Sequence, residues 1–149
     1  MKLEDEIKQK VFSSQYHRLT LNIMFTASWL QTQTARILKP YSITPQQYNV
    51  LRILRGQNGK PASVGLIQER MLDKSSNASR LIDKLLEKKL IDRKICPEDR
   101  RQMEVRITQK GTDVLAELDP IMRNMDGVFK TLTEQEAKLV GELLDKLRG

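Results

Sequence analysis

Residues 75–107, SSNASRLIDKLLEKKLIDRKICPEDRRQMEVRI, decide the fold of this chain. The first part predicts a helix from about Ser75 to Lys89, because apolar residues recur at the spacing of one helical face: Ala78, Leu81, Ile82 and Leu85. Apolar and polar residues alternate over Met103–Ile107, which indicates a strand, and Ile91–Ile95 is a weaker strand candidate. The charged segment between these strands, residues 96–102, predicts the turn of a β-hairpin.

Further helices are expected on both sides of this stretch. Residues 1–39 contain neither Gly nor Pro and predict one very long helix, or two helices with a break near Ser13 and Ser14. Thr44 to Gln47 form a capping box that opens a helix over Pro45–Leu54, and a short helix follows over about residues 63–71. Thr108 caps a helix of about twenty residues, and a second capping box at Thr133–Glu136 opens the last helix.

Three short helices followed by a hairpin describe a winged helix-turn-helix, so we expect a mainly α fold of the α+β kind. A length of 149 residues predicts one domain. Residues 40–111 would form the winged-helix lobe, and residues 1–39 and 112–149 would form dimerisation helices outside it. The last helix carries more apolar surface than one chain needs, which predicts a homodimer; its candidate interface residues are Leu139, Leu143 and Leu147, with Val140 and Leu144.

The charge of the chain favours a polyanionic partner. Twenty-six Lys and Arg against nineteen Asp and Glu give a net charge of +7 and a pI near 9.6, which suits nucleic acid or an anionic membrane surface. Residues 60–111 carry a net +5, whereas residues 112–149 carry a net −3. The basic charge therefore lies in the predicted winged-helix lobe.

Several classes of protein are excluded by composition and motifs. One Cys and one His exclude a disulfide framework and a Cys/His zinc site within one chain, so we expect neither metal nor cofactor. His17 has no nearby nucleophile, and the chain lacks the glycine-rich phosphate loops and the H-E-x-x-H motif, so we do not expect an enzyme. Neither a spanning segment nor a signal peptide is recognisable, so we expect a cytoplasmic protein away from membranes.

Two surfaces are candidates for DNA contact. Opposite its apolar face, the helix over residues 75–89 presents small and basic residues in its first turns, where a recognition helix meets base edges. At the hairpin tip, two arginines can reach a minor groove, and Asp99 would hold one of them by a charge-assisted pair. The candidate DNA-binding residues are Ser75, Ser76, Asn77, Ser79, Arg80, Lys84, Arg100 and Arg101.

Explanations of both surfaces that involve no DNA contact stay open. The polar face of the helix is equally explained by contact with water, and its far end carries two acids, Asp83 and Glu87, that suit phosphate badly. Charged triplets such as Asp99–Arg101 are most often solvated loops. The hairpin's position after three short helices makes DNA contact the favoured interpretation.

Four segments together resemble a known family: Ile43–Leu51, Arg80–Leu85, Pro97–Arg101 and Ile107–Gly111. They are similar to the MarR family of bacterial transcriptional regulators, and the similarity covers nearly the whole chain. It implies a homodimer that binds a pseudo-palindromic site on double-stranded DNA, in most cases as a repressor. It assigns Ser75–Lys84 to the major groove and residues 99–101 to the wing. The chain departs from the family at Lys89, where glycine is usual.

The resemblance also implies regulation by a small compound, often aromatic and anionic, in a cleft beside the DNA-binding lobe. Tyr41 and Tyr48 flank the corresponding helix junction and are candidate pocket residues. Cys96 has basic neighbours and offers an alternative, a redox-responsive regulator, although an incidental thiol at a turn is the favoured interpretation. A second alternative is a winged-helix adaptor that binds a protein partner and no specific DNA.

Overall fold

The computed structural model describes the backbone of residues 1–149 and all side chains except those at positions 125, 126, 128 and 129. The chain is mainly helical with a small antiparallel sheet, as the sequence predicts. In chain order the elements are α1 (Leu3–Glu6), α2 (Gln15–Leu38), the 3-10 helix η1 (Lys39–Tyr41), α3 (Pro45–Arg55), β1 (Ala62–Ser63), α4 (Val64–Arg70), α5 (Ala78–Glu87), β2 (Ile91–Ile95), β3 (Met103–Ile107), α6 (Gln109–Met125), the 3-10 helix η2 (Asp126–Thr131) and α7 (Glu134–Arg148).

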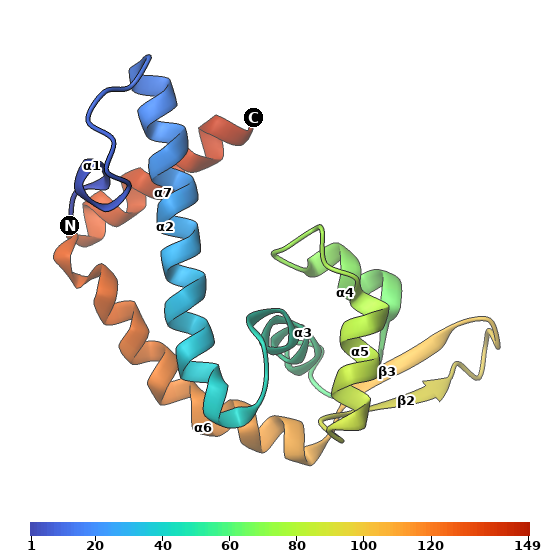
Figure 1. Ribbon diagram of the computed structural model, residues 1–149. Coiled ribbons are helices and arrows are strands. Elements are labelled where there is room, and N and C mark those ends of the chain that lie inside the picture. Colours follow the sequence, from blue (N-terminus) through green and yellow to red (C-terminus); the bar gives the residue numbers. More distant parts are fainter.

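The elements form two parts (Figure 1). The winged lobe consists of α3, α4, α5 and the sheet, with the β2–β3 hairpin projecting from it as the wing. The stem consists of α2, α7 and the end of α6. Over the described residues, no helix has the length and apolar character that crossing a bilayer requires.

The N-terminal segment corrects the prediction of a single helix over residues 1–39. Only one turn, α1, is helical before residue 15, and the long helix α2 begins after Ser14. The Ser14 hydroxyl accepts a hydrogen bond from the backbone N–H of His17 at 3.1 Å and caps α2. The start of α2 agrees with the alternative that places a break near Ser13 and Ser14, but residues 7–14 are not helical, so the first of the two expected helices is only one turn long.

The sheet has the strand order β1-β3-β2. Ile91 pairs with Ile107 and Ile95 with Met103, which confirms the predicted hairpin, and Ala62 of β1 lies opposite Val105. The sequence did not predict β1, because two residues are too few to show an alternating pattern. Both α3 and α5 contribute to the buried cluster behind the sheet, which includes Leu38, Leu51, Leu54, Ile82, Leu85, Val105, Leu115 and Leu118.

The turn between α5 and β2 contains Lys89 with φ of 60°. Glycine reaches this left-handed conformation at less cost than other residues. The family that the chain resembles usually has glycine here, and glycine is the residue best suited to the left-handed conformation that Lys89 adopts. Its carbonyl accepts a hydrogen bond from the hydroxyl of Thr108 at 2.9 Å, which joins the turn to the start of α6.

Candidate nucleic-acid interface

Helix α5 starts three residues later than the sequence predicts. Asn77 is its N-cap, and the Asn77 side chain accepts a hydrogen bond from the backbone N–H of Arg80 at 3.0 Å. The backbone N–H of Ala78 donates a hydrogen bond to Oε1 of Gln68 in α4, at 3.0 Å. Ser75 and Ser76 therefore lie in the turn before the helix, and the exposed first turn presents Ser79 and Arg80.

Asp73 organises the turn that precedes α5. Its carboxylate accepts hydrogen bonds from the backbone N–H of Ser75 at 3.0 Å and from the Ser75 hydroxyl at 2.6 Å. These bonds, with one from Ser76, hold the pKa of the Asp73 carboxyl below its ordinary value. The two serines thus fix the entry into α5, and their hydroxyl groups are already engaged by Asp73.

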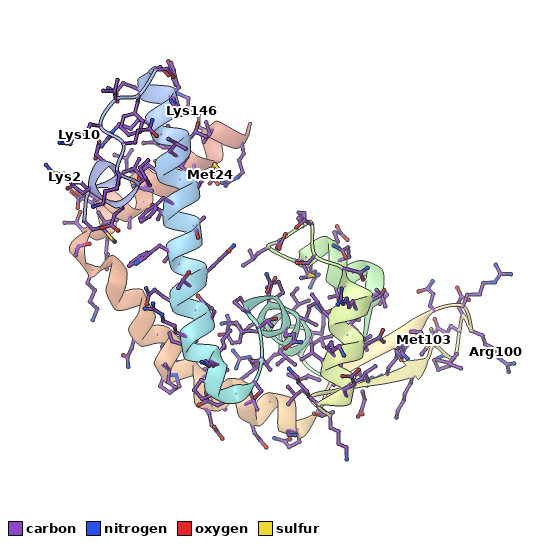
Figure 2. All side chains as sticks on the ribbon, in the orientation of Figure 1. Lys2, Lys10, Met24, Arg100, Met103 and Lys146 are labelled. Atoms are coloured by element: carbon purple, nitrogen blue, oxygen red, sulfur yellow. The ribbon has the colours of Figure 1, made fainter. Side chains whose placement is uncertain are left out.

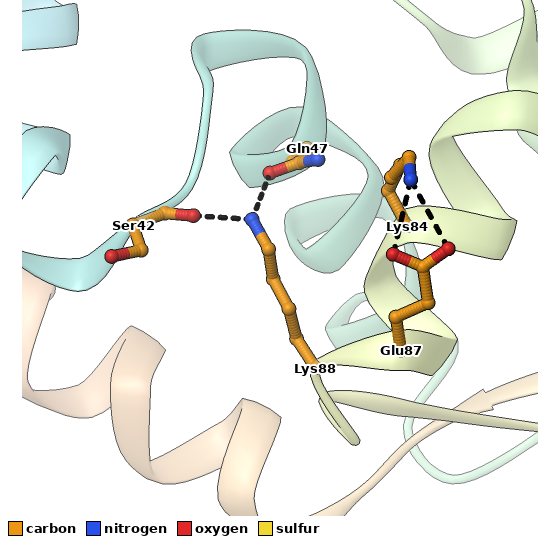
Figure 3. Close-up of polar contacts among 5 residues, drawn as sticks. All are labelled: Ser42, Gln47, Lys84, Glu87 and Lys88. Atoms are coloured by element: carbon orange, nitrogen blue, oxygen red, sulfur yellow. Dashed lines mark hydrogen bonds and ion pairs between the residues drawn. The ribbon is translucent and has the colours of Figure 1, made fainter.

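Two lysines near the C-terminal end of α5 are engaged by neighbouring residues (Figure 3). Lys88 donates to Gln47 Oε1 at 3.0 Å and to the carbonyl of Ser42, which ties α5 to α3 and to the turn before it. Lys84 is paired with Glu87 at 3.1 Å. Of the predicted DNA-binding residues on α5, Arg80 carries a charge without a partner among the described residues, whereas the Lys84 charge is partly neutralised.

The wing carries both predicted arginines in exposed positions. Figure 2 shows Arg100 at the far end of the hairpin, directed away from the lobe. Among the described side chains Asp99 forms no ion pair with an arginine, so the predicted pair is wrong. Asp99 instead accepts from the backbone N–H of Arg101 at 3.0 Å and from the Gln102 side chain at 3.2 Å. Asp99 therefore shapes the tip through the main chain, and the Arg100 and Arg101 side chains stay available.

Cys96 is half-buried at the start of the tip turn. Its backbone N–H donates to the carbonyl of Gln102 at 2.9 Å, which closes the turn, and the thiol takes no part in this bond. A redox role for Cys96 stays a prediction.

A cleft of about 920 Å³ lies between α2, α3, α6 and the turn before α5. Tyr48 lines it as predicted, but Tyr41 does not line it, because η1 places Tyr41 against the buried core. The other lining residues are Leu30, Gln31, Thr34, Pro45, Gln46, Asn49, Arg52, Met71, Leu72, Asp73, Lys74, Ser75 and Met122.

Arg52 is the residue of this cleft that the sequence reasoning missed. Its guanidinium donates to the hydroxyl of Tyr48 at 3.1 Å and lies 5.8 Å from the centroid of the Tyr48 ring. Among the described side chains, no carboxylate forms an ion pair with Arg52. The spacing of Tyr48 and Arg52, four residues apart on one helix, was the available signal.

The last helix exposes one apolar face. Leu139, Leu143 and Leu147 are 54%, 55% and 61% exposed, and Val140 beside them is 46% exposed. On α2 of the same stem, Tyr16 and Met24 are 83% and 64% exposed. Exposed apolar surface of this extent makes α7 a candidate interaction surface.

Comparison with known proteins gives a consistent result. The sequence model of the MarR family matches residues 43–103. The HTH-type transcriptional regulator MhqR of Bacillus subtilis is 29% identical over 108 residues, 72% of this chain and 73% of that protein. The HTH-type transcriptional repressor IacR of Pseudomonas putida is 29% identical over 111 residues, 74% of this chain and 65% of that protein.

A solved structure confirms the fold over almost the whole chain. The organohalide-sensing transcriptional regulator RdhR, in its 2,4-dichlorophenol-bound form, superposes with a TM-score of 0.82 at 17% identity. The match covers 94% of this chain and 85% of the other. The winged lobe and the stem are therefore both parts of a recurring architecture.

Proposed function

Because the chain belongs to the MarR family, we propose that it is a homodimeric transcriptional repressor that binds a pseudo-palindromic site on double-stranded DNA and responds to a small ligand. The observation that carries the proposal is the lobe itself: the exposed first turn of α5 and the arginine-tipped wing project from one rigid core. The relatives are named as transcription regulators, which agrees with a role other than catalysis.

The proposed recognition follows from groove geometry. A major groove admits an α-helix, and the first turn of α5 brings Ser79 and Arg80 to the base edges. The wing lies beside α5 and carries Arg100 and Arg101 to the adjacent minor groove, where narrow A·T tracts attract arginine. Lys88 and Asp73 hold the two ends of α5, so the helix presents these side chains without a prior ordering cost.

A second copy of the chain is the proposed cover for the apolar face of α7. Leu139, Leu143 and Leu147 would pack against the stem of the partner, and a two-fold axis would place two α5 helices about 34 Å apart, one turn of the duplex. This spacing matches successive major grooves on one side of the DNA. The dimer thus doubles the contacts and explains a palindromic site.

The proposed effector is a small aromatic anion in the cleft at Tyr48. The aromatic part would lie among Leu30, Met71 and Met122, and the negative group would pair with the guanidinium of Arg52. The cleft also touches Asp73 and Ser75, the turn that positions α5. A ligand that fits only when this turn is displaced would shift the population away from the DNA-binding form.

The decisive experiment is selection of duplexes from random sequence, followed by affinity and salt-dependence measurements on the selected site. Arg80→Ala should cost about 1–3 kcal/mol and relax the preference for one base pair. Arg101→Ala should weaken binding and make log K fall less steeply with log salt concentration, by the slope of about one phosphate contact. Lys138→Gln, which removes an exposed charge on α7, is the matched control and should leave affinity unchanged.

Selection of no duplex by the wild type would refute the proposal and favour the protein-binding adaptor. For the effector, benzoate should release the selected duplex whereas benzyl alcohol, which lacks the charge, should not. Arg52→Gln should abolish the benzoate response and leave DNA affinity unchanged. Equal responses to both compounds would exclude the anion site at Arg52.

A further inference from the structure

Arg55 of α3 and Asp119 of α6 form a bidentate ion pair. Arg55 Nη1 lies 2.8 Å from Asp119 Oδ2, and Arg55 Nη2 lies 2.9 Å from Asp119 Oδ1. Both side chains are about one third exposed, at 32% and 30%. Two parallel charge-assisted hydrogen bonds fix the relative orientation of two groups as well as their distance. The pair therefore constrains how α6 lies against α3.

The pair sits where α6 leaves the winged lobe. Leu115 and Leu118 belong to the buried core of the lobe, whereas Pro120 is exposed and Ile121 is 39% exposed. Met122 still packs against that core, so Asp119 lies where α6 begins to leave the lobe for the stem. Figure 1 shows α6 passing beneath the lobe before the chain continues to α7.

Pro120 makes this point of the helix easy to bend. A proline inside a helix has no N–H to donate to the carbonyl four residues earlier, and its ring presses against that turn. A helix that has lost this bond resists bending less than an intact one. The ion pair lies directly beside the weakened turn, where it can compensate for the lost restraint.

The charges around Asp119 favour the ionised form of its carboxyl group. Arg55 lowers the pKa of the Asp119 carboxyl most, through its hydrogen bonds, and the nearby charges of Arg52 and Arg123 lower it further. Asp119 in turn raises the pKa of Arg55. Among the described side chains, no other ion pair connects the winged lobe to α6.

We propose that the Arg55–Asp119 pair sets the angle between the winged lobe and the stem, and so fixes the separation at which the two α5 helices of a dimer meet DNA. This inference rests on the proposed function. Arg55 and Asp119 are positioning residues, because they act through α5 and touch no base. One base pair added between half-sites moves them apart by about 3.4 Å and turns them by about 35°, so a fixed angle selects one spacing.

The test measures spacing preference. Three duplexes carry the two selected half-sites, with a spacer of the best length, one base pair shorter or one base pair longer. Fluorescence anisotropy gives the affinity for each, and the spacing ratio is the affinity for the best spacer divided by the affinity for a changed spacer. In Asp119→Asn this ratio should fall about fivefold, the change that about 1 kcal/mol of lost orientation energy produces. Arg55→Lys, which keeps the charge but loses the planar fork, should show a smaller fall. The double variant Arg55→Asp with Asp119→Arg should recover much of the preference.

Glu142→Gln serves as the control, because it removes an exposed ion pair with Lys138 on α7, away from the joint. Asp119→Asn should lose some stability in either case, but a purely structural role would weaken binding at all spacings equally and leave the spacing ratio unchanged. An unchanged spacing ratio in both Asp119→Asn and Arg55→Lys would overturn the inference while leaving the proposed function intact. Absence of duplex binding by the wild type would overturn both.

Discussion

Gly111 provides a sharp test of the packing between α6 and the turn after α5. It stands in the first turn of α6, in the segment Ile107–Gly111 that contributes to the family resemblance. A Cβ at this position would lie 2.2 Å from the carbonyl oxygen of Leu90 and 2.8 Å from Cγ1 of Ile107. The first of these atoms belongs to the backbone and cannot rotate away. Gly111→Ala therefore forces α6 to move by about 1 Å, since ordinary contacts lie near 3.5 Å.

That movement breaks specific bonds. The Leu90 carbonyl accepts from the N–H of Thr108 at 3.1 Å, and the Thr108 hydroxyl donates to the Lys89 carbonyl at 2.9 Å. Losing one such bond costs about 1 kcal/mol, and overpacking costs about 1–3 kcal/mol more. Alanine regains about 1 kcal/mol of helix propensity. We expect a net loss of about 2 kcal/mol, which lowers the melting temperature by about 4–8 °C.

Gly141→Ala is the matched control, because the same substitution there should have the opposite sign. Gly141 lies inside α7, and a Cβ added to it would have no atom of the described residues within 4 Å. At 100° per residue it also points away from Leu139 and Leu143. Alanine should stabilise the chain by about 1 kcal/mol. Thermal unfolding of both variants at one protein concentration gives the comparison, and a melting temperature of Gly111→Ala at or above that of the wild type would refute the packing argument.

Further expected outcomes concern acid stability, the dimer and the wing. Because the pKa of Asp119 is lowered in the folded chain, its pair stabilises the fold above the unfolded pKa of about 3.9 and loses this effect as the pH falls through the folded pKa. The stability gap between wild type and Asp119→Asn, about 1 kcal/mol at pH 7 after allowance for solvent screening, should therefore close below about pH 4. If chemical unfolding shows the same stability difference between wild type and Asp119→Asn from pH 7 to pH 2, the expected direction of this pH dependence is wrong. Leu143→Glu should give a monomer by sedimentation at micromolar concentration, and an intact dimer would exclude the α7 face as its interface. Asp99→Ala should loosen the wing tip and cost about 0.5–1 kcal/mol in DNA affinity with an unchanged melting temperature; a change in melting temperature instead would place Asp99 in the folding core.

Local signals in the sequence located the elements that depend on a few neighbouring residues. The capping boxes at Thr44 and Thr133 are present, with side chain and backbone bonded in both directions. The two strands of the wing pair as the antiparallel hairpin that the sequence predicts. Each of these features is decided within about four residues or across one turn, so no knowledge of distant contacts was needed.

Distant contacts explain what the sequence left undetermined. Ser75 was a plausible start for the recognition helix, but Gln68 of α4 binds the N–H of Ala78, and this bond across two helices favours Asn77 as the cap. β1 forms only because β3 lies beside it. The ion pair between Arg55 and Asp119 links residues 64 positions apart in the sequence, and the periodicity of apolar residues carries no information over such a separation.

The acids of α5 illustrate how folding changes the meaning of a charge. Asp83 and Glu87 suit contact with phosphate badly when the sequence is considered alone, and would favour a tilt of the far end of the helix away from DNA. Asp83 is paired with Arg93 of β2 at 3.1 Å, and Glu87 with Lys84 at 3.1 Å. These exposed pairs add little stability, yet each places a positive charge beside a carboxylate. The repulsion that the far end of α5 offers to a phosphate is thereby reduced, so a tilt of the helix is not required by charge alone. Among the described side chains, Arg80 is then the cation of α5 that forms no ion pair, which concentrates the positive potential at the first turn, where base edges are read.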